Sequence, residues 1–518
     1  MSAKSNIVSR SVASCFLFKF SASAKPKVAL FRRSTKVKAY QQCLAPISGS
    51  IEETDKSPIA AVWREINEET TLTPANLNLF RRGKPYSFTD EKVGRVWTVH
   101  PFAFSLKSKD DEKKIQLDWE HEGFSWHDPL KVTDDGSLQG VPFLAKSLRR
   151  VWFDMDLGKA RGRILRRGLE SLQKDDISGA RQLASKALDI FRHLVTEVPG
   201  EDAETWRYNA RSAAWHLWNN GCGSMDAVIL NTLVRGLRLI DDEVERIKGG
   251  IITQDSLARI SQQFLELEQK RDEAPERIWQ SLKPMLEDLA RNSSEPVKVV
   301  TLGASSTVAW CLQRALRVGG LSLDIRVVES APLFEGVSMA AELAEFSHGS
   351  LAATSGSRIT VYPDESAVDA SSNADILLLG ADLIAGDGAV SNKLGSMLSV
   401  LRARCASSKM KVVVLAELEK ILAVPEPTNE EENDRLELIK ARLLGNIRGD
   451  SAEATFEMES AVAQRSAARN VEFEWVDPGL VDAYISEDAV RGTEDIIRQA
   501  DISRAEVERL FAEPETVV

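Results

Sequence analysis

Residues 380–396 read Gly-Ala-Asp-Leu-Ile-Ala-Gly-Asp-Gly-Ala-Val-Ser-Asn-Lys-Leu-Gly-Ser and decide the fold of the C-terminal part of the chain. They follow the apolar run 376–379. Together, the two segments predict a parallel strand that opens into a loop of small and polar residues. Ligands of open α/β sheets bind beyond the carboxyl ends of strands, where glycines let backbone N–H groups approach a phosphate. We therefore expect a ligand site here, with Asp382 as acid or base and Asn392 and Lys393 as donors.

The surrounding sequence predicts three regions. Residues 1–150 alternate short strand-like runs with turns around one clear helix at 57–69, which is an α+β pattern. Residues 155–292 have apolar residues at helical spacing and predict a helical domain. From 297 to 510 strands and helices alternate, which predicts an α/β domain with a doubly wound, Rossmann-like parallel sheet. The predicted helices span 180–195, 203–218, 225–248 and 253–290, and the predicted strands span 298–302, 324–328, 359–362, 375–379, 411–416 and 471–475.

Composition excludes several classes of protein. A net charge of −11 over 518 residues argues against a general nucleic-acid or membrane-surface binder. Five scattered cysteines without a C-x-x-C pair indicate neither zinc nor a redox dithiol, and they favour a reducing, cytoplasmic compartment. No apolar run approaches the roughly 20 residues of a membrane span. The acidic, proline-bearing segment 425–434 predicts a solvated loop.

The first 51 residues contain nine Lys or Arg and no Asp or Glu. That composition is found in mitochondrial transit peptides. The runs 11–20 and 27–31 are apolar and β-prone, however, and a short Ser/Ala/Lys/Pro turn separates them. We expect a folded hairpin, and a targeting segment is the alternative.

The helix at 57–69 carries a cluster of carboxylates. Glu65 stands three and four residues before Glu68 and Glu69, so the three share one helical face and repel one another. Hard oxygen ligands on one face suit Mg²⁺ or Mn²⁺, whose charge removes the repulsion and can bridge to a diphosphate. A solvated acidic face without a metal is the alternative.

With Gly49 upstream, this segment resembles the Nudix box of enzymes that hydrolyse nucleoside diphosphate derivatives. The resemblance covers about residues 8–150 and implies that Gly49 opens the loop and Arg64 orients the acidic cluster. It also implies that Glu65, Glu68 and Glu69 bind the metal, with Glu68 also catalytic. The sequence departs from the family pattern in two places: Asp55 stands for a glutamate and adds one residue before Arg64, and Thr71 replaces the glycine that ends the helix.

A second candidate loop follows the strand predicted at 298–302. Gly303, Ser305, Ser306 and Thr307 could place backbone amides and hydroxyls around a phosphate at a helix N-terminus. Alternatively, the hydroxyl residues only cap the helix.

The motif at 380–396 resembles the GAD…NK signature of a family that joins the alpha, beta and delta subunits of eukaryotic translation initiation factor 2B to isomerases of methylthioribose 1-phosphate and ribose 1,5-bisphosphate. Further matching motifs lie at 326–336, 412–420 and 471–486, and the resemblance covers about residues 160–510. In the isomerases a cysteine works with the aspartate of the GAD motif, but Gly303 stands at that position here. Cys311 lies eight residues later, about 12 Å along a helix, and is not expected to replace it.

These resemblances imply three functions. The first is an initiation factor 2B subunit-like protein with a fused Nudix-like domain, which binds a nucleotide or sugar phosphate or partner initiation-factor subunits. The second is a Mg²⁺-dependent Nudix hydrolase regulated by the C-terminal domain, and the third is a sugar-phosphate isomerase, which Gly303 disfavours. A homodimer through the C-terminal domain is implied by resemblance.

Overall fold

The computed structural model describes residues 8–21, 24–91, 93–175, 178–221, 226–318, 321–331, 333–349, 356–406, 409–423, 473–512 and 516–517. The segment 425–434, which we expect to be a solvated loop, lies outside these residues. The chain divides into two compact units: unit 1 comprises 1–226, 235–262 and 509–518, and unit 2 comprises 227–234 and 263–508. The domain boundaries predicted from the sequence stay a prediction. None of the helices in the described part combines the length and apolar character needed to cross a bilayer.

Unit 1 begins with a strand-rich region. The hairpin expected near the N-terminus is formed by β1 (Val8–Ser21) and β2 (Ala24–Arg33), which pair antiparallel. The sheet has the order β19-β6-β7-β1-β2-β3, with β4 on β1, β5 on β7 and β8 on β2. The other strands are β3 (Leu44–Ala45), β4 (Ile47–Ser50), β5 (Leu77–Arg82), β6 (Tyr86–Asp90), β7 (Arg95–Leu106), β8 (His121–His127) and β19 (Thr516–Val517). The helical elements are α1 (Pro58–Thr70), η1 (Asp111–Lys114), η2 (Pro129–Lys131) and α2 (Leu144–Arg149).

Two hydrophobic cores cover this sheet. Because side chains alternate along a strand, Cys15 and Leu17 of β1 lie in one core while Phe16 and Phe18 lie in the other. Helix α1 packs into the first core through its apolar stripe, which includes Ile66. Glu69 stands three residues after Ile66 and is buried with this stripe, and the carboxylate of Glu65 lies against Gly49 of β4.

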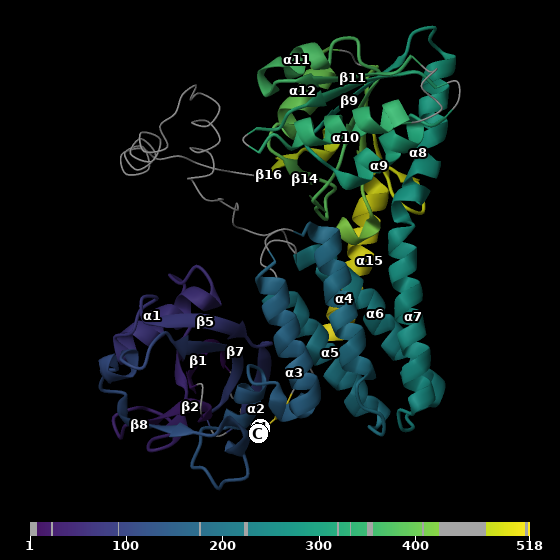
Figure 1. The fold of residues 1–518 in the computed structure, drawn as a ribbon. Coiled ribbons are helices and arrows are strands. Elements are labelled where there is room, and N and C mark those ends of the chain that lie inside the picture. Colours follow the sequence, from purple (N-terminus) through teal and green to yellow (C-terminus); the bar gives the residue numbers. More distant parts are fainter. Residues whose placement is uncertain are drawn as a thin grey trace, which may run out of the picture. The chain divides into compact units, whose positions relative to one another are not determined.

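A helical region follows, as the sequence predicts (Figure 1). The run predicted at 253–290 is two helices, because the chain breaks at Glu273 and Pro275 begins the next helix, where its missing N–H costs nothing. The prediction names no separate helix at 144–149 or at 154–173, although nearly all of the second range lies in the predicted helical domain. The helices are α3 (Asp154–Gln173), α4 (Ala180–Thr196), α5 (Ala203–Gly221), α6 (Asp226–Ile247), α7 (Gln254–Asp272) and α8 (Ala274–Arg291).

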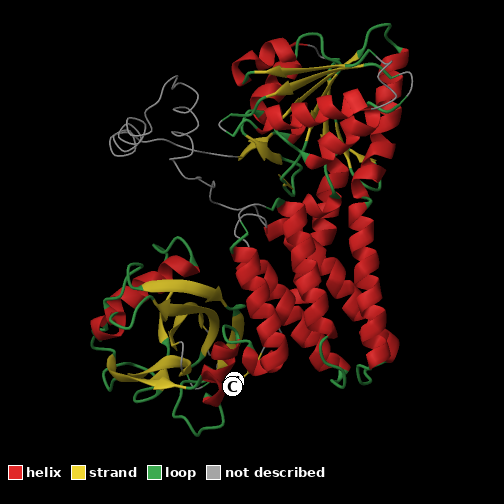
Figure 2. Ribbon diagram, viewed as in Figure 1, coloured by secondary structure: helices red, strands yellow, loops and turns green. Residues whose placement is uncertain are grey.

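Unit 2 is an α/β region built on a seven-stranded sheet of order β11-β10-β9-β12-β15-β17-β18 (Figure 2). All its pairs are parallel except β17 with β18, and the order is that of doubly wound sheets. Its strands are β9 (Val297–Leu302), β10 (Leu323–Val328), β11 (Arg358–Tyr362), β12 (Ile376–Leu379), β15 (Lys411–Leu415), β17 (Ala483–Ile485) and β18 (Val490–Arg491). Its helices are α9 (Ser306–Ala315), α10 (Glu335–Gly349), α11 (Ala367–Ala370), α12 (Ser396–Ala406) and α15 (Thr493–Phe511), with 3-10 turns η3 (Asp364–Ser366), η4 (Leu418–Lys420) and η5 (Pro478–Leu480).

One predicted strand belongs elsewhere. The prediction of a parallel strand at 471–475 is wrong, because β16 (Phe473–Val476) pairs antiparallel with β14 (Val390–Lys393) in a separate small sheet with β13 (Leu383–Ile384). The place beside β15 is taken by β17, whose three residues give too short a pattern to predict.

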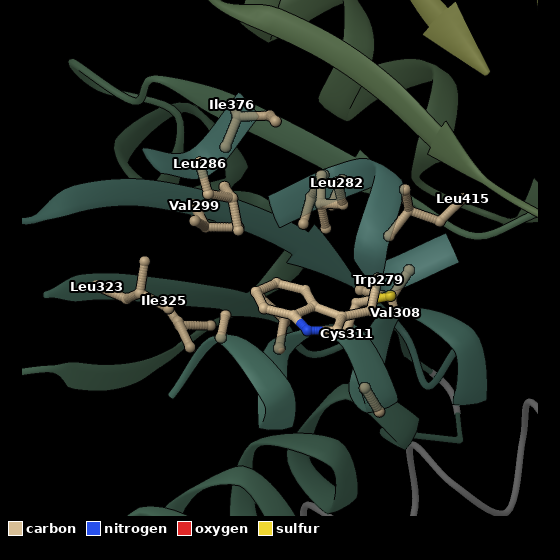
Figure 3. Packing of buried hydrophobic residues seen from close by; sticks show 14 of the residues in the cluster. Trp279, Leu282, Leu286, Val299, Val308, Cys311, Leu323, Ile325, Ile376 and Leu415 are labelled. Atoms are coloured by element: carbon tan, nitrogen blue, oxygen red, sulfur yellow. The ribbon is translucent and has the colours of Figure 1, made fainter. Parts of the chain in front are cut away.

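Both faces of the parallel sheet are covered. Val299 lies in a core with α8, α9 and α10, whereas Val300, the next residue, lies in a core with α11, α12 and α15. Figure 3 shows the first core, in which Trp279 packs near Val308, Cys311 and Ile325. With helices on both faces, the carboxyl ends of the strands are the edge at which polar loops can gather.

Candidate functional site

Helix α1 forms where the sequence predicts it. Ser57 is the N-cap, with its hydroxyl accepting from the Ala60 amide at 3.3 Å, and Pro58 lies in the first turn. The helix ends at Thr71, which has φ 62° and donates its N–H to the Asn67 carbonyl. This left-handed conformation is normally taken by glycine, so the β-branched threonine is strained.

Gly49 lies directly against the side chain of Glu65. A Cβ atom at residue 49 would lie 2.0 Å from Cδ of Glu65, so no larger residue fits without moving that carboxylate. Strand β4 pairs with β1, with Gly49 opposite Ala13, and this pairing fixes the position of Gly49. The structure thus brings together two residues of the predicted site.

Arg64 organises the acidic residues around it. Its guanidinium binds Asp55 bidentately, with Nε to Oδ1 at 3.2 Å and Nη2 to Oδ2 at 2.9 Å. Its Nη1 reaches Oε1 of Glu65 at 2.7 Å and Oε2 of Glu68 at 3.2 Å. The hydrogen bond from Arg64 lowers the pKa of Asp55, so Asp55 is a carboxylate. Despite the extra residue in the loop, Asp55 still reaches the arginine.

Glu69 has a different environment from its two neighbours. It is 3% exposed, and its Oε2 has no hydrogen-bond partner among the described residues. Burial first, and then the carboxylates of Glu65 and Glu120, raise the pKa of Glu69 to about 9. His121 Nδ1 lies 3.4 Å from Oε2 without a hydrogen bond, and burial lowers the pKa of His121 to about 4. The neutral imidazole therefore supplies no compensating charge at pH 7.

The sequence prediction omits Asp118, Glu120 and His121, which join this cluster just before and at the start of β8. Burial also raises the pKa of Glu120. The signal available in the sequence is the run Asp-Trp-Glu-His-Glu at 118–122, which places acids and a histidine at the edge of a strand-like segment. No sequence pattern within a few residues of 118–122 indicates that this run contacts α1.

The carboxylate oxygens of this cluster are of the type that hard divalent cations bind. Throughout the described part of the chain, no three His, Cys, Asp or Glu side chains lie close enough together to hold a metal ion. Glu65 and Glu68 are paired with Arg64 instead. Glu69, with an unpartnered oxygen and a raised pKa, still fits an added cation, which would favour its charged form. The ligand roles of these three glutamates stay a prediction.

In unit 2 the predicted loops meet where the strand order reverses, between β9 and β12. A Cβ atom at Gly380, which follows β12, would lie 2.5 Å from Oγ of Ser305 and 3.8 Å from Oδ1 of Asn392. The 380–396 segment and the loop after β9 therefore touch. Asn392 is buried on β14 rather than in a loop, and its amide donates to Ser396 at 3.0 Å.

Gly303 and Lys393 are also neighbours. Gly303 has φ 63°, and a Cβ there would lie 3.5 Å from Cγ of Lys393 and 3.7 Å from Oγ of Ser330. The ammonium of Lys393 is 3.2 Å from Oε1 of Glu335. An anionic ligand that approaches Lys393 would therefore find Glu335 already paired with it.

The three hydroxyl residues differ in their surroundings. Ser305 is the N-cap of α9 and accepts from the Val308 amide at 3.4 Å. Thr307 is buried and donates to Oε1 of Glu417 at 2.7 Å, whereas Ser306 is exposed. The capping interpretation is thus correct for Ser305, and Ser306 is the hydroxyl most open to a ligand.

Asp382 is half-buried, and its N–H donates to the Ser391 carbonyl at 2.8 Å. Beside it, Lys420 donates to the Ala381 carbonyl at 2.7 Å and lies 3.3 Å from Oε2 of Glu417. The sequence prediction omits Lys420 as a site residue, although the Glu-x-x-Lys after a predicted strand is the signal that could have found it.

Cys311 belongs to the core rather than to these loops. It is fully buried among Trp279 and Val308, and its thiol contacts the Pro275 carbonyl at 4.0 Å (Figure 3). Burial raises its pKa. A thiol in this environment stays protonated and is not available for proton transfer.

Comparison with known proteins agrees with this two-part architecture. Residues 176–490 match the model of the Initiation factor 2 subunit family, and residues 9–151 match the NUDIX domain. A translation initiation factor eIF-2B subunit 2-like protein of Pyrococcus horikoshii is 25% identical over 256 residues, covering 48% of this chain and 76% of that protein.

Solved structures with similarity include eIF2B beta from Chaetomium thermophilum, with a TM-score of 0.46, 14% identity, and coverage of 69% of this chain and 96% of that one. Another is 5-methylthioribose 1-phosphate isomerase from Pyrococcus horikoshii, with a TM-score of 0.42, 16% identity, and coverage of 67% and 87%.

The described elements define a strand-rich N-terminal region, a helical region and an α/β region. The chain belongs to the Initiation factor 2 subunit family and carries an N-terminal NUDIX domain, which confirms both resemblances identified in the sequence.

Proposed function

We propose that the α/β region of unit 2 binds a phosphorylated small molecule, such as a sugar phosphate or nucleotide, without isomerising it. The observation that carries the proposal is the convergence of Gly303, Gly380 and Lys393 at the strand-order reversal between β9 and β12. Glycine backbone, a helix N-terminus at Ser306 and a lysine together favour a phosphate.

The same geometry argues against isomerisation. Moving a proton between two sugar carbons needs a paired acid and base. Gly303 contributes no side chain, and Cys311 is enclosed in the core. Of the acid–base pair of the isomerases this chain keeps only the aspartate, Asp382, which is proposed to accept hydrogen bonds from ligand hydroxyls.

Calorimetric titration with ribose 1,5-bisphosphate and methylthioribose 1-phosphate tests this function. We expect Lys393→Ala to weaken binding of the tighter of the two ligands by about tenfold. Asp382→Asn should weaken it by about 5- to 160-fold, which corresponds to roughly 1–3 kcal/mol. Lys411→Ala is the matched control, because Lys411 is an exposed lysine at the amino end of β15, opposite the loops. Equal effects of the two lysine substitutions, or turnover of either sugar phosphate, would contradict the proposal.

A second function is favoured by the buried Oε2 of Glu69, which has no hydrogen-bond partner among the residues that the structure describes. We propose that the NUDIX domain hydrolyses a nucleoside diphosphate derivative with Mg²⁺ or Mn²⁺, regulated by the C-terminal region. A bound divalent ion would supply charge to polarise the diphosphate. Glu65, Glu68 and Glu69 would hold it, Glu68 would also take part in catalysis, and Arg64 would orient the first two while Asp55 fixes Arg64.

A hydrolysis screen with Mg²⁺ over nucleoside diphosphate derivatives tests this second function. Glu69→Gln should lower both the affinity for Mg²⁺, measured by calorimetry, and the rate of hydrolysis. Glu53→Gln is the matched control, since Glu53 is an exposed acid of the preceding loop. Equal Mg²⁺ affinity for the parent and Glu69→Gln would refute the metal site.

Membership of the Initiation factor 2 subunit family also suggests partners and a cellular compartment for this chain. We propose that the chain forms a homodimer through its C-terminal region, or joins other initiation-factor subunits, in the cytoplasm. Native mass spectrometry of the purified chain, alone and mixed with such subunits, tests both assemblies. A strictly monomeric chain in both samples would contradict them.

A further inference from the structure

Unit 1 contains a cavity of about 730 Å³ that the functions above leave unexplained. Its walls come from the end of the β1–β2 hairpin, from β5, from η2 and from the whole length of α3. The volume is within the range of roughly 300–1,000 Å³ that small-molecule sites occupy. The cavity is therefore large enough for a ligand such as a mononucleotide.

The cavity lies away from the acidic cluster of α1. Phe18 of β1 belongs to the core on the face of the sheet opposite α1, and Phe20, two residues further, continues on that face and lines the cavity. The sheet thus separates the cavity from Glu69. A ligand here would not contact the carboxylates proposed to hold metal.

Aromatic rings form one side of the cavity. Trp152 stacks on Phe18 with ring centroids 5.0 Å apart, and Phe20 meets Phe80 edge-on at 5.5 Å. Phe20 is 50% exposed, which is unusual for a large apolar ring beside a formed core. A planar ring system placed against Phe20 would cover it and gain stacking energy.

Cations outnumber acids in the rest of the lining, where Lys25, Arg81, Lys159, Arg163 and Arg166 stand beside Asp128, Asp154 and Glu170. Lys159, Arg163 and Arg166 line the cavity from α3, at the four- and three-residue spacing that puts them on one helical face. Arg166 is 2.6 Å from Asp154, but neither Lys159 nor Arg163 has an ion-pair partner among the residues that the structure describes. In a chain of net charge −11, two unpaired cations at the edge of one cavity favour an anionic ligand.

Two buried polar groups in the wall also lack partners. Arg81 is 6% exposed, and its Nε has no hydrogen-bond acceptor in the described part of the chain, although Nη1 donates to the Val151 carbonyl at 2.6 Å. Asp154 likewise has a buried Oδ1 without a donor among those residues. Buried polar groups normally have partners, and because both atoms are closed to solvent a ligand would bond to them only after Arg81 or Asp154 turns toward the cavity.

We propose that this cavity is a mononucleotide site, separate from the NUDIX acidic cluster and from the loops of unit 2. The base stacks against Phe20 beside Trp152, and the phosphate lies between Lys159 and Arg163. Hydroxyl or amino groups of the nucleotide bond to Asp154. A half-open cavity of this volume takes one nucleotide rather than a strand of nucleic acid.

Calorimetry of the full chain in EDTA, with the four ribonucleoside 5′-monophosphates as probes, tests the proposal without metal or hydrolysis. We expect at least one of them to bind. Phe20→Ala should weaken its binding by about 5- to 160-fold, the range for loss of base stacking. Arg163→Glu should weaken it at least tenfold. Arg167→Glu is the matched control, because Arg167 is an exposed arginine of α3 outside the cavity lining, and we expect less than a twofold change.

Three results would overturn the proposal. The first is no binding of any monophosphate at millimolar concentration, and the second is equal loss for Arg163→Glu and Arg167→Glu. The third is affinity that falls with Lys393→Ala but not with Phe20→Ala, which would place the nucleotide in unit 2. Circular dichroism of each variant checks that the chain is folded; Phe20 and Arg163 are both exposed, so their substitution leaves the cores intact.

Discussion

Two buried glutamates, one in each unit, have the same exposure and opposite surroundings. Glu69 of the NUDIX domain and Glu419 of the α/β region are both 3% exposed. Glu419 is bound bidentately by Arg271, with both N···O distances 2.8 Å, and is also 3.2 Å from the hydroxyl of Thr232. Glu69 has an oxygen with no partner among the described residues, and other acids surround it.

The difference shows that burial by itself does not indicate the role of a carboxylate. A buried acid that is fully paired holds a structure together, because its charge is satisfied within the chain. A buried acid whose neighbours are mainly other acids and a neutral imidazole stays protonated or requires an added cation. By this criterion Glu419 is structural, and Glu69 is the residue that indicates a site.

The largest effect is expected at the paired glutamate. Arg271→Leu leaves Glu419 buried without a counter-charge, so the free energy of unfolding should fall by about 3–5 kcal/mol, measured by urea denaturation. Arg277→Leu, an exposed arginine of α8, is the control and should change it by less than about 1 kcal/mol. A similar fall in the free energy of unfolding for both variants would contradict the structural role assigned to Glu419.

The second prediction is that the free energy of unfolding depends on pH through Glu69. The pKa of Glu69 is raised to about 9, above the roughly 4.3 of an unfolded glutamate, so the native state holds the proton more tightly. Its contribution to stability is therefore complete below about pH 4 and is lost as pH rises toward 9. Glu69→Gln should abolish this slope and gain about 2 kcal/mol over the parent at pH 9, measured by urea denaturation across pH. An unchanged slope would show that Glu69 is charged at neutral pH.

The binding loops of unit 2 can be tested at Gly303, where φ is 63°. Gly303→Cys restores the residue that the isomerases have, yet a side chain in this conformation is strained, so stability should fall by about 1 kcal/mol. Gly303→Ala should lose the same amount, since the strain comes from Cβ. Isomerase activity in the cysteine variant, measured with ribose 1,5-bisphosphate, would show that the loops lack only a thiol.

The smallest effect concerns the end of α1 beside Glu69. Thr71 has φ 62°, so Thr71→Gly should relieve strain and raise the melting temperature, with a gain of about 0.5–1 kcal/mol. Thr70→Gly is the contrasting variant, because Thr70 is helical and its hydroxyl bonds to the Ile66 carbonyl, so it should lose stability. A loss for Thr71→Gly would mean that its bond to the Lys114 carbonyl outweighs the strain.

The sequence by itself determined the elements whose signals are local. The cap at Ser57 and the apolar stripe through Ile66 predict α1, and the alternation of apolar runs predicts the strands before Gly303 and Gly380. Spacing along one helix also placed Glu65, Glu68 and Glu69 on a single face. These signals are reliable because the interactions they reflect lie within a few residues of one another.

Tertiary structure decided which of those residues are paired. Only the folded chain brings Glu120 and His121 to Glu69, Lys420 to the loop after β12, and Arg271 to Glu419. It also put β17, rather than β16, beside β15, and opened the cavity between Phe20 and Arg163. Hydrogen bonds, charge pairing and burial join segments far apart in sequence, and a local pattern of residue types carries no information about that distance.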